Sequence, residues 1–593
     1  MNFNLNQVPL SRIEVPRPGA AADLFLTRHV HPQFGPGWLL FDSPSEILQA
    51  NCTDSLKELL ARIEEHSHDA GFAAGWLTYE SGSVFDSALT SLTDEQPLAC
   101  FGLFQSPPRY YRVLPFVDGE LPEWTVEWSE KQYRQLFDKV AVQIQEGVTY
   151  QVNLAFPMAA KFADDWDLFC QLAGTAPPTY ATFARIAGIS VLSLSPELFF
   201  EKSGFRVVSK PMKGTRSRCP GDPAGISQAE ELLHSNKDRA ENLMIVDMVR
   251  NDMGRFAKPG TTSVDKLFEI EPHRTVWQMT STISCESDAK LSEILAGLFP
   301  CASVTGTPKV EATRTIAELE SRPRGVYTGA LGYVLPEGDC RMSVPIRTIQ
   351  WREDVGRYFV GSGIVADSTP ESEWNECLVK AAALRSAPEP FQLLETMLFE
   401  PGSGIFLLEY HMVRMESSAQ ALEFKFDAEK IRSTLQASEL WNYESPRRLR
   451  LLVNRAGEIE LQHEPFSQPV GPLKAVLDSY PQPMSDLLAC HKTTARDHLA
   501  CVKERHPMQE EVLMQTENGH LCGFLKGNLV IELHGRKLTP EFGNHFLAGT
   551  YARYLTEIGE VEFAPLTVRD LDSATRFWRI NSVTGWVEIN LSC

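Results

Sequence analysis

Hydrophobic residues recur along this chain at two different spacings. Between Ser129 and Gln145 they return every three or four positions, the spacing of an amphipathic helix, and Gly147 follows as a stop signal. Shorter apolar runs bounded by turn residues are typical of buried strands. Further helices are predicted around 56–63, 228–248 and 371–384. Strands are predicted around 75–79, 101–104, 150–154, 180–186, 190–194, 197–201, 205–209, 342–351, 356–362 and 511–514.

Short strands that alternate with a few long helices predict an α+β fold, with mostly antiparallel sheets flanked by helices. The pattern stops at Arg385–Pro390, because Pro388 and Pro390 lack backbone donors and restrict the residues before them. It restarts at Phe391. We therefore expect residues 1–125 to be the N-terminal part of a first domain, 126–386 its core, 387–390 a linker and 391–593 a second domain.

Length and charge narrow the class of protein. The chain has 593 residues, too many for one core, and a formal net charge of −21 from 56 Lys and Arg against 77 Asp and Glu. This acidity disfavours a nucleic-acid partner, and it means that an anionic substrate needs a locally positive pocket. The 12 Cys are scattered, which favours reduced thiols and a cytoplasmic location. We expect neither a leader peptide nor a membrane span.

Three polar clusters are candidates for chemistry. Glu197 ends a strand, and Lys213 follows in the segment 210–216, which we expect to be a loop. Asp238 and Glu241 are three positions apart in a predicted helix, so their carboxylates share one face. The third cluster is the glycine-bounded segment 361–365, followed by Glu373, Glu376 and Lys380.

Two helices that each present paired carboxylates can form an all-oxygen site for Mg²⁺. The alternative for each pair alone is a solvated helix face. Taken together, beside glycine-bounded segments that let backbone approach a ligand, the pairs favour a metal site.

These residues resemble the chorismate-utilising enzymes, a family that includes anthranilate, aminodeoxychorismate, isochorismate and salicylate synthases. The resemblance covers about 125–386. The segments that carry it are 150–154, 195–197, 210–216, 238–255, 306–309, 324–329, 361–365 and 373–380.

The resemblance implies a Mg²⁺ ion near Glu241, Glu373 and Glu376, with Asp238 close by, bridging to the ring carboxylate of chorismate. It further implies substrate contacts from the side chains or backbone of Thr215, Tyr327, Arg347, Gly361, Gly363 and Lys380. Among these, Tyr327 and Arg347 would hold the pyruvyl carboxylate. Gln278 stands where many members of the family have His.

Lys213 separates the branches of the family, since it resembles the lysine of aminodeoxychorismate synthases where most other branches have alanine. A neutral Lys213 amine would attack C2 of chorismate while Glu197, as general acid, helps the C4 hydroxyl to leave. Ammonia would then add at C4 and expel the lysine, giving 4-amino-4-deoxychorismate for 4-aminobenzoate and folate synthesis. The alternative is an anthranilate synthase activity. No glutamine-hydrolysing motif is found in the sequence, so ammonia is expected from a separate glutamine amidotransferase subunit.

The segment 391–593 resembles fold-type IV pyridoxal-phosphate enzymes, which include aminodeoxychorismate lyase. The resemblance rests on His491–Arg496 together with segments around 411–415, 528–530, 549–550 and 581–582. It implies two α+β subdomains. It also implies that Lys492 carries the cofactor, that Arg414 holds its phosphate, and that Gly549 and Thr550 offer backbone donors. A fused lyase would release pyruvate and leave 4-aminobenzoate.

Three positions depart from that family. Gly523 stands where a glutamate pairs with the pyridine nitrogen, and Ala552 and Thr584 stand where relatives have arginine. Without the carboxylate the cofactor is a weaker electron sink. Two hypotheses therefore stay open for the second domain: a working lyase, or a degenerate module kept for folding or docking.

Overall fold

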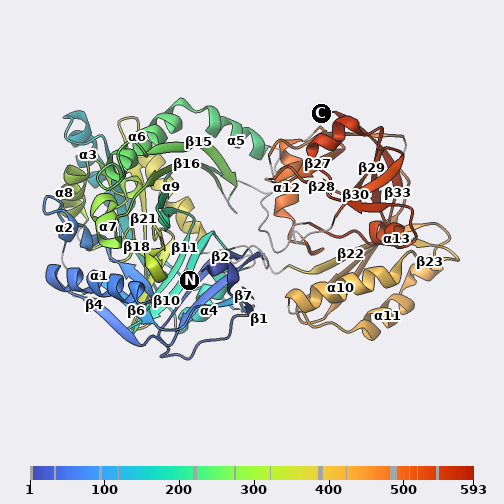
Figure 1. Ribbon diagram of the computed structural model, residues 1–593, viewed down its shortest axis with the longest axis horizontal. Helices are drawn as coiled ribbons and strands as arrows, with labels where there is room; N and C mark the ends of the chain where they lie inside the picture. Colours follow the sequence, from blue (N-terminus) through green and yellow to red (C-terminus); the bar gives the residue numbers. More distant parts are fainter. Residues whose placement is uncertain are drawn as a thin grey trace. The chain divides into compact units, whose positions relative to one another are not determined.

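The fold was analysed in a computed structural model (Figure 1). The structure describes residues 4–31, 35–92, 96–117, 119–174, 177–217, 224–272, 276–320, 322–384, 391–422, 424–469, 471–480, 490–506, 508–516, 518–541 and 546–592. The chain forms two compact units, and most of the second is Glu389–Cys593. The expected linker, 387–390, lies outside the described residues.

Two large sheets make up the first unit. The first contains β1 (Leu10–Glu14), β2 (Leu24–His31), β3 (Gly35–Asp42), β7 (Arg109–Val113), β8 (Thr125–Val126), β9 (Gln151–Lys161), β10 (Tyr180–Ile186), β11 (Ile189–Ser195), β17 (Gly306–Thr307), β20 (Thr348–Arg352) and β21 (Val355–Ile364). Their order is β1-β7-β3-β2-β10-β11-β20-β21-β9-β17, with β8 beside β9. Strands from the N-terminal 125 residues and from the catalytic core thus share one sheet.

The second sheet of this unit is built in the same way. It contains β4 (Glu46–Ala50), β5 (Phe72–Leu77), β6 (Ala99–Phe104), β12 (Leu198–Ser203), β13 (Arg206–Lys210), β14 (Met212–Ser217), β15 (Ser263–Pro272), β16 (Val276–Glu286), β18 (Ala330–Val334) and β19 (Cys340–Ser343). Their order is β14-β16-β13-β12-β19-β18-β5-β6-β4, with β15 beside β16. Nearly all neighbouring strands in both sheets run antiparallel, so the α+β prediction is confirmed.

Helices cover these sheets. They are α1 (Thr53–His68), α2 (Gly82–Phe85), α3 (Glu130–Gln145), α4 (Asp165–Ala173), α5 (Ala224–His234), α6 (Asn236–Met253), α7 (Leu291–Leu298), α8 (Lys309–Leu319) and α9 (Pro370–Ala381). Helix α6 packs on β14 and β16, and α9 packs on β21 and α3 (Figure 1). The predicted helix 129–145 is confirmed as α3: Ser129 caps it by accepting a bond from the Gln132 amide, and Tyr133, Phe137 and Val140 are buried.

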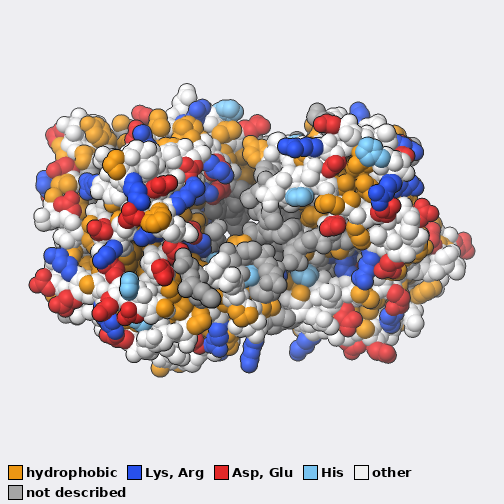
Figure 2. Space-filling view, in the orientation of Figure 1, with side chains coloured by type: hydrophobic (Ala, Val, Ile, Leu, Met, Phe, Trp, Pro, Cys, Tyr) orange, Lys and Arg blue, Asp and Glu red, His pale blue; other side chains and the backbone are white. Residues whose placement is uncertain are grey.

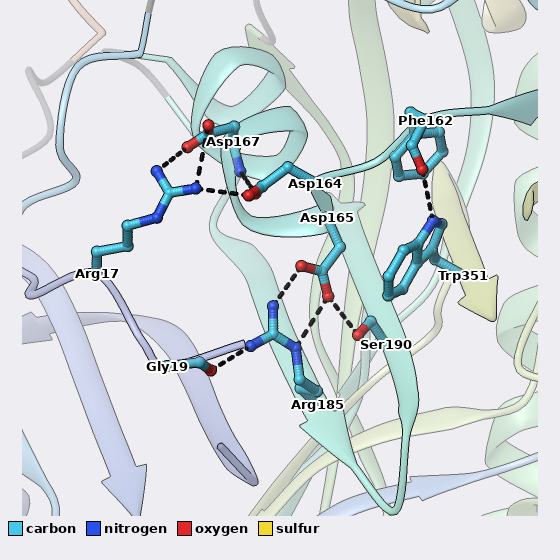
Figure 3. Close-up of polar contacts among 9 residues, drawn as sticks. All are labelled: Arg17, Gly19, Phe162, Asp164, Asp165, Asp167, Arg185, Ser190 and Trp351. Carbon is cyan, nitrogen blue, oxygen red and sulfur yellow. Dashed lines mark hydrogen bonds and ion pairs between the residues drawn. The ribbon is translucent and has the colours of Figure 1, made fainter. Parts of the chain in front are cut away.

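The start of α4 shows how polar contacts fix a helix between strands (Figure 3). Asp164 caps α4 by accepting a bond from the Asp167 amide at 2.8 Å. Arg17 bonds to both of these carboxylates. Between them in sequence, Asp165 is buried and pairs with Arg185 of β10. Because a buried carboxylate needs such a partner, these bonds hold α4 against the sheet.

Three sequence predictions are wrong in detail. The single helix expected over 228–248 is two helices, because the Ser235 side chain caps α6 by accepting a bond from the Asp238 amide. The strand expected over 342–351 is broken between β19 and β20, where Pro345 has no amide donor for a ladder. The segment 210–216 is not a loop, since most of it belongs to β14, which pairs with β16.

The second unit has two separate sheets, as expected for two subdomains. The smaller sheet, in the order β23-β22-β24-β25, contains β22 (Leu393–Glu400), β23 (Gly404–Ile405), β24 (Arg447–Val453) and β25 (Ile459–Pro465). The larger contains β26 (Leu473–Leu477), β27 (Glu511–Gln515), β28 (Leu521–Phe524), β29 (Asn528–Leu533), β30 (Arg536–Pro540), β31 (Glu562–Ala564), β32 (Arg576–Asn581) and β33 (Gly585–Ser592). The helices are α10 (Leu408–Leu422), α11 (Ala428–Ala437), α12 (Asp497–Arg505) and α13 (Thr550–Glu557). Helix α10 packs on β22, and α13 packs on β32.

Figure 2 shows acidic and basic side chains interspersed over the described surface of both units, with hydrophobic side chains between them. Both signs of charge therefore share this face. Among the described residues, the helices are all too short or too polar to cross a membrane.

Candidate functional site

Lys213 lies on β14, where this strand meets α6. The φ of Gly214 is +91°, and a Cβ there would lie 3.1 Å from Asp238 Cβ, so glycine allows the helix to approach. Lys213 Nζ is 3.9 Å from Glu241 Oε2 on α6. It also lies 2.5 Å from the position that a Cβ of Gly363 on β21 would take. Three elements far apart in sequence therefore meet at this amine, and Gly363 leaves the space for it.

Glu197 follows β11 and is buried. Its Oε1 accepts a hydrogen bond from Ser303 Oγ at 2.6 Å and a longer one from the Met212 amide at 3.4 Å. Burial raises the pKa of Glu197 to about 7, although these two bonds and the charges of Lys213 and Lys380 act in the opposite direction. The carboxyl group can therefore hold a proton near neutral pH, as a general acid must.

The four predicted metal ligands lie on two helices, Asp238 and Glu241 on α6 and Glu373 and Glu376 on α9. Burial raises the pKa of Glu241, and the negative charges of Asp238 and Glu373 add to this rise. Such a set of oxygens suits a hard divalent cation. Within the described residues, however, no three His, Cys, Asp or Glu side chains are grouped closely enough to hold a metal ion.

Cationic side chains occupy part of this set instead. Arg216 donates to Asp238 at 2.7 Å, and Lys380 pairs with Glu376 at 2.7 Å. Burial alone would raise the pKa of Glu376, but Lys380 outweighs it and the pKa is lowered. Lys380 Nζ also donates to the Gly361 carbonyl at 2.9 Å. This bond joins the last turn of α9 to β21 and brings the residues predicted for the ring carboxylate together.

The two side chains predicted for the pyruvyl carboxylate are Tyr327 and Arg347. Tyr327 is buried and stacks on Phe359 with ring centroids 5.6 Å apart, and burial raises the pKa of Tyr327. Arg347 has a φ of +51°, and burial lowers the pKa of Arg347. Among the described side chains, none bonds to its guanidinium group. A partly buried guanidinium without a counter-ion suits a carboxylate ligand.

Gln278, the position that departs from the family's histidine, lies on β16 opposite Thr215. Thr215 Oγ1 donates to Gln278 Oε1 at 3.1 Å, and Gln278 Nε2 donates to the Gly214 carbonyl at 2.8 Å. The amide therefore holds β14 at Gly214 and at Thr215, immediately after Lys213. An imidazole is absent from this position, and its place is taken by a neutral group that fixes the strand.

Sequence reasoning missed two residues of this site. Gln151 on β9 is fully buried, and neither Oε1 nor Nε2 has a hydrogen-bond partner among the described residues. Its Nε2 lies 3.1 Å from the position of a Gly363 Cβ, on the side where Lys213 lies. An unpaired buried amide is costly unless a polar ligand satisfies it. Gln151 was visible only as a polar residue in an apolar run, and nothing local linked Ser303 to Glu197.

In the second unit, Lys492 is largely buried. Burial lowers the pKa of Lys492 to about 7, and the charges of Arg414 and Arg496 add to this effect, while Glu395 at 4.0 Å opposes it. Glu395 is bonded to Arg414 at 2.6 and 2.8 Å and to His411 Nδ1 at 2.7 Å. The amine of Lys492 is therefore neutral for much of the time near pH 7.

Lys492 and Arg414 line a cavity of about 580 Å³, together with Gly549 and Thr550 at the start of α13. A Cβ at Gly549 would lie 1.7 Å from Asn528 Oδ1, so only glycine fits there. The amine, the guanidinium group and the helix N-terminus suit the aldehyde and phosphate of pyridoxal phosphate. The four predicted residues are thus brought together around one cavity.

The three departures also lie in or near this cavity. Gly523 lines it, and a Cβ there would be only 3.1 Å from the Gly527 carbonyl, so a glutamate would crowd that backbone. Ala552 is buried within α13. Thr584 Oγ1 accepts a bond from Arg579 at 2.9 Å, and Arg579 lines the cavity. The Arg579 guanidinium group therefore gives this wall of the cavity a positive charge, although Thr584 stands where relatives have arginine.

Two family models match different parts of the chain. Residues 114–386 match the model for chorismate binding enzymes, and residues 392–591 match the model for amino-transferase class IV. Both predicted resemblances are confirmed.

Curated relatives match the first unit. Aminodeoxychorismate synthase component 1 of Escherichia coli (strain K12) is 39% identical over 263 residues, which are 44% of this chain and 58% of the relative. Anthranilate synthase component 1 of Aquifex aeolicus (strain VF5) is 33% identical over 275 residues, 46% of this chain and 56% of the relative. The chain thus spans a little over half the length of these relatives. The crystal structure of anthranilate synthase component I from Streptococcus pneumoniae TIGR4 shares the fold, with 21% identity, a TM-score of 0.53, and coverage of 63% of this chain and 94% of that chain.

Proposed function

From an enzyme chain that joins a chorismate binding domain to a class IV amino-transferase domain, we infer a two-step synthesis of 4-aminobenzoate. The first unit converts chorismate and ammonia into 4-amino-4-deoxychorismate and water. The second unit converts this product into 4-aminobenzoate and pyruvate. The observation that carries the proposal is the position of Lys213. Its amine lies 3.9 Å from Glu241, and its charge acts on the buried Glu197.

In the first step, the neutral Lys213 amine forms a bond to C2 of chorismate. Both ring double bonds shift, from C1=C2 to C1=C6 and from C5=C6 to C4=C5, the C4–O bond breaks, and Glu197 gives its proton to the departing hydroxyl, which leaves as water. Ammonia then forms the C4–N bond, the two double bonds return to their original positions, and the C2–N bond breaks to release the neutral lysine. A proton lost by the new ammonium group restores the Glu197 carboxylic acid. A protonated Glu197 is needed at the start of this step, and its raised pKa supports that role.

The carboxylates support binding of the substrate through a cation. Glu241, Glu373 and Glu376 would hold Mg²⁺, with Asp238 nearby, and the ion would supply positive charge for the ring carboxylate of chorismate. Arg347 and Tyr327 would take the pyruvyl carboxylate. These contacts orient C2 towards Lys213, and the unpaired Arg347 guanidinium supports this assignment.

The ammonia would come from a separate glutamine amidotransferase subunit, as the name "component 1" of the relatives suggests. Gln151 lies beside Lys213 and can accept a hydrogen bond from a neutral amine through Oε1. An amide cannot protonate ammonia, so it would keep the nucleophile reactive.

In the second step, pyridoxal phosphate would withdraw electrons from the bound amine. Lys492 would carry the cofactor and then move a proton at the ring carbon next to that amine, which its pKa of about 7 supports. Arg414 and the amides at Gly549 and Thr550 would hold the phosphate. The absent carboxylate at Gly523 makes the electron sink weaker, so we expect this step to be slower than in relatives that keep it.

The identity of the products tests both steps. The purified chain is incubated with chorismate, Mg²⁺ and ammonium, with and without pyridoxal phosphate, and the products are resolved by chromatography with mass detection. We expect 4-aminobenzoate and pyruvate when the cofactor is present. Accumulation of 4-amino-4-deoxychorismate in both samples would support the first step and contradict the second. Formation of anthranilate would contradict the role of Lys213.

A further inference from the structure

The cavity of the second unit carries far more positive than negative charge. Six cationic side chains line it, Arg414, Arg448, Lys492, Arg496, Lys526 and Arg579, against one acidic side chain, Glu464. Three of these arginines have acidic partners: Arg414 pairs with Glu395, Arg448 with Glu464 and Arg579 with Glu511. With the cofactor phosphate assigned to Arg414, the other cationic side chains of the cavity still carry positive charge that no anion balances.

Arg496 is the clearest case. Its Nε donates to the Thr493 carbonyl at 3.2 Å, which fixes the side chain and leaves both terminal nitrogens without a bond to any described residue. Burial lowers the pKa of Arg496, and the positive charges of Arg414 and Arg450 add to the effect. A guanidinium group held among other cations in a cavity wall is unfavourable until an anion binds.

Arg450 lies near enough to Arg496 for their charges to repel each other. It lies on β24 directly opposite Thr396 of β22, so the two side chains project from the same face of the sheet. Thr396 lines the cavity. Arg450 likewise has no acidic partner among the described residues. Arg450 is not itself one of the residues that line the cavity, but its positive charge acts on Arg496, so two arginines from separate segments lie close to this wall.

We propose that Arg450 and Arg496 form a carboxylate-binding site for the substrate of the second unit, an amine-bearing ring acid. The inference rests on the proposed function, because the amine of that substrate must reach Lys492, four residues before Arg496. A planar guanidinium group matches a carboxylate with two parallel hydrogen bonds, and the terminal nitrogens of Arg496 make no bond to any described residue. The site would orient the ring so that its amine, rather than its acid, meets Lys492.

A pair of ligands tests the site without relying on turnover. 4-Aminobenzoate and aniline share the amine and the ring, and only the first has a carboxylate. Their dissociation constants are measured by titration calorimetry on the full-length chain saturated with pyridoxal phosphate, and again on the chain without it. The unchanged chain should bind 4-aminobenzoate at least about tenfold more tightly than aniline. Arg496→Gln and Arg450→Gln should each reduce this preference about tenfold and leave the affinity for aniline unchanged.

Matched variants assign the effect to the cavity. Arg432→Gln removes a surface arginine of the same unit, paired with Glu409, and should keep the preference. If Arg496→Gln fails to fold, Arg496→Lys is measured instead. It keeps the positive charge but loses the paired donors of the guanidinium group, and should retain only part of the preference.

Two outcomes would overturn the site. One is an unchanged chain that binds both ligands equally, and the other is an Arg496→Gln variant that keeps the preference but binds pyridoxal phosphate more weakly, which would assign Arg496 to the phosphate. A chain that shows the preference, loses it in Arg496→Gln and yet releases no pyruvate would uphold the site and refute the lyase step. Failure of the inference is thus separable from failure of the proposed function.

Discussion

Each unit builds its site around a lysine, but the surroundings of the two lysines have opposite charge. Lys213 faces Glu241 in a group of carboxylates from α6 and α9. Lys492 has Glu395 at 4.0 Å but lies among arginines, and burial together with the arginines' charges lowers its pKa to about 7. On the proposed function, the first site would therefore need an added cation to bind an anionic ring acid. The second supplies the positive charge from its own side chains.

On the proposed function, this difference indicates how one chain would bind a dicarboxylate at two sites. In the first unit, a metal ion and Arg347 would share the two acids of the substrate. In the second unit, Arg450 and Arg496 would take an acid directly. On the proposed function, the comparison also indicates how a strongly acidic chain would bind anionic substrates, since the first pocket would become locally positive with a bound metal ion and the second has its own cationic side chains.

The largest expected effect comes from removing each lysine in turn. Lys213→Ala should lower the rate of 4-amino-4-deoxychorismate formation at least about a thousandfold, because no other nucleophile is at hand. The same variant should still convert added 4-amino-4-deoxychorismate. Lys492→Ala should do the reverse and accumulate that intermediate. Both rates are followed by chromatography of quenched samples.

Lys237→Ala is the matched control, since Lys237 lies 4.0 Å from the same Glu241 and its side chain is half exposed. It should leave both rates within about threefold of the unchanged chain. Equal losses for Lys213→Ala and Lys237→Ala would mean that charge around Glu241, and not a nucleophile, is what the first step requires.

The second prediction concerns the metal. Glu241→Gln removes one charged oxygen ligand and should raise the Mg²⁺ concentration needed for half-maximal amination at least about a hundredfold. Rate is measured against Mg²⁺ in buffer treated to remove divalent ions. Asp247→Asn, an exposed carboxylate of the same helix, should leave the curve in place. An unchanged curve for Glu241→Gln would show that this residue does not bind the metal ion. The proposed contrast between the two pockets would then lose its basis.

Much of this architecture could be predicted from the sequence because the signals are local. The apolar period of α3, its cap at Ser129, and the i,i+3 carboxylates of α6 and α9 all lie within a few residues of one another. Family resemblance then supplied roles for side chains such as Lys213 that periodicity alone leaves ambiguous. These parts of the fold depend little on which segments meet in space.

The missing parts depend on distant segments. β14 was expected to be a loop because its strand character comes from pairing with β16, about sixty residues later. Ser303 and Glu197 are 106 residues apart, and Arg450 and Arg496 lie in different elements. No local pattern marks such contacts. They were also the contacts that decide protonation and charge at the two sites.

The smallest predicted effect tests how the first site controls protonation. The Ser303 hydroxyl donates to the Glu197 carboxylate and so favours its charged form, against the burial that raises its pKa to about 7. Ser303→Ala removes this donor, so the pKa should rise further. A general acid works only while protonated, and activity is lost as pH rises through its pKa. The alkaline limb of kcat/KM should therefore move to higher pH by about one unit, the equivalent of about 1.4 kcal/mol. Ser303→Thr, which keeps the hydroxyl, should return the limb to its original position. A lower rate with the alkaline limb at the same pH would show that Ser303 only packs against Glu197. The raised pKa of Glu197 would then be due to burial alone.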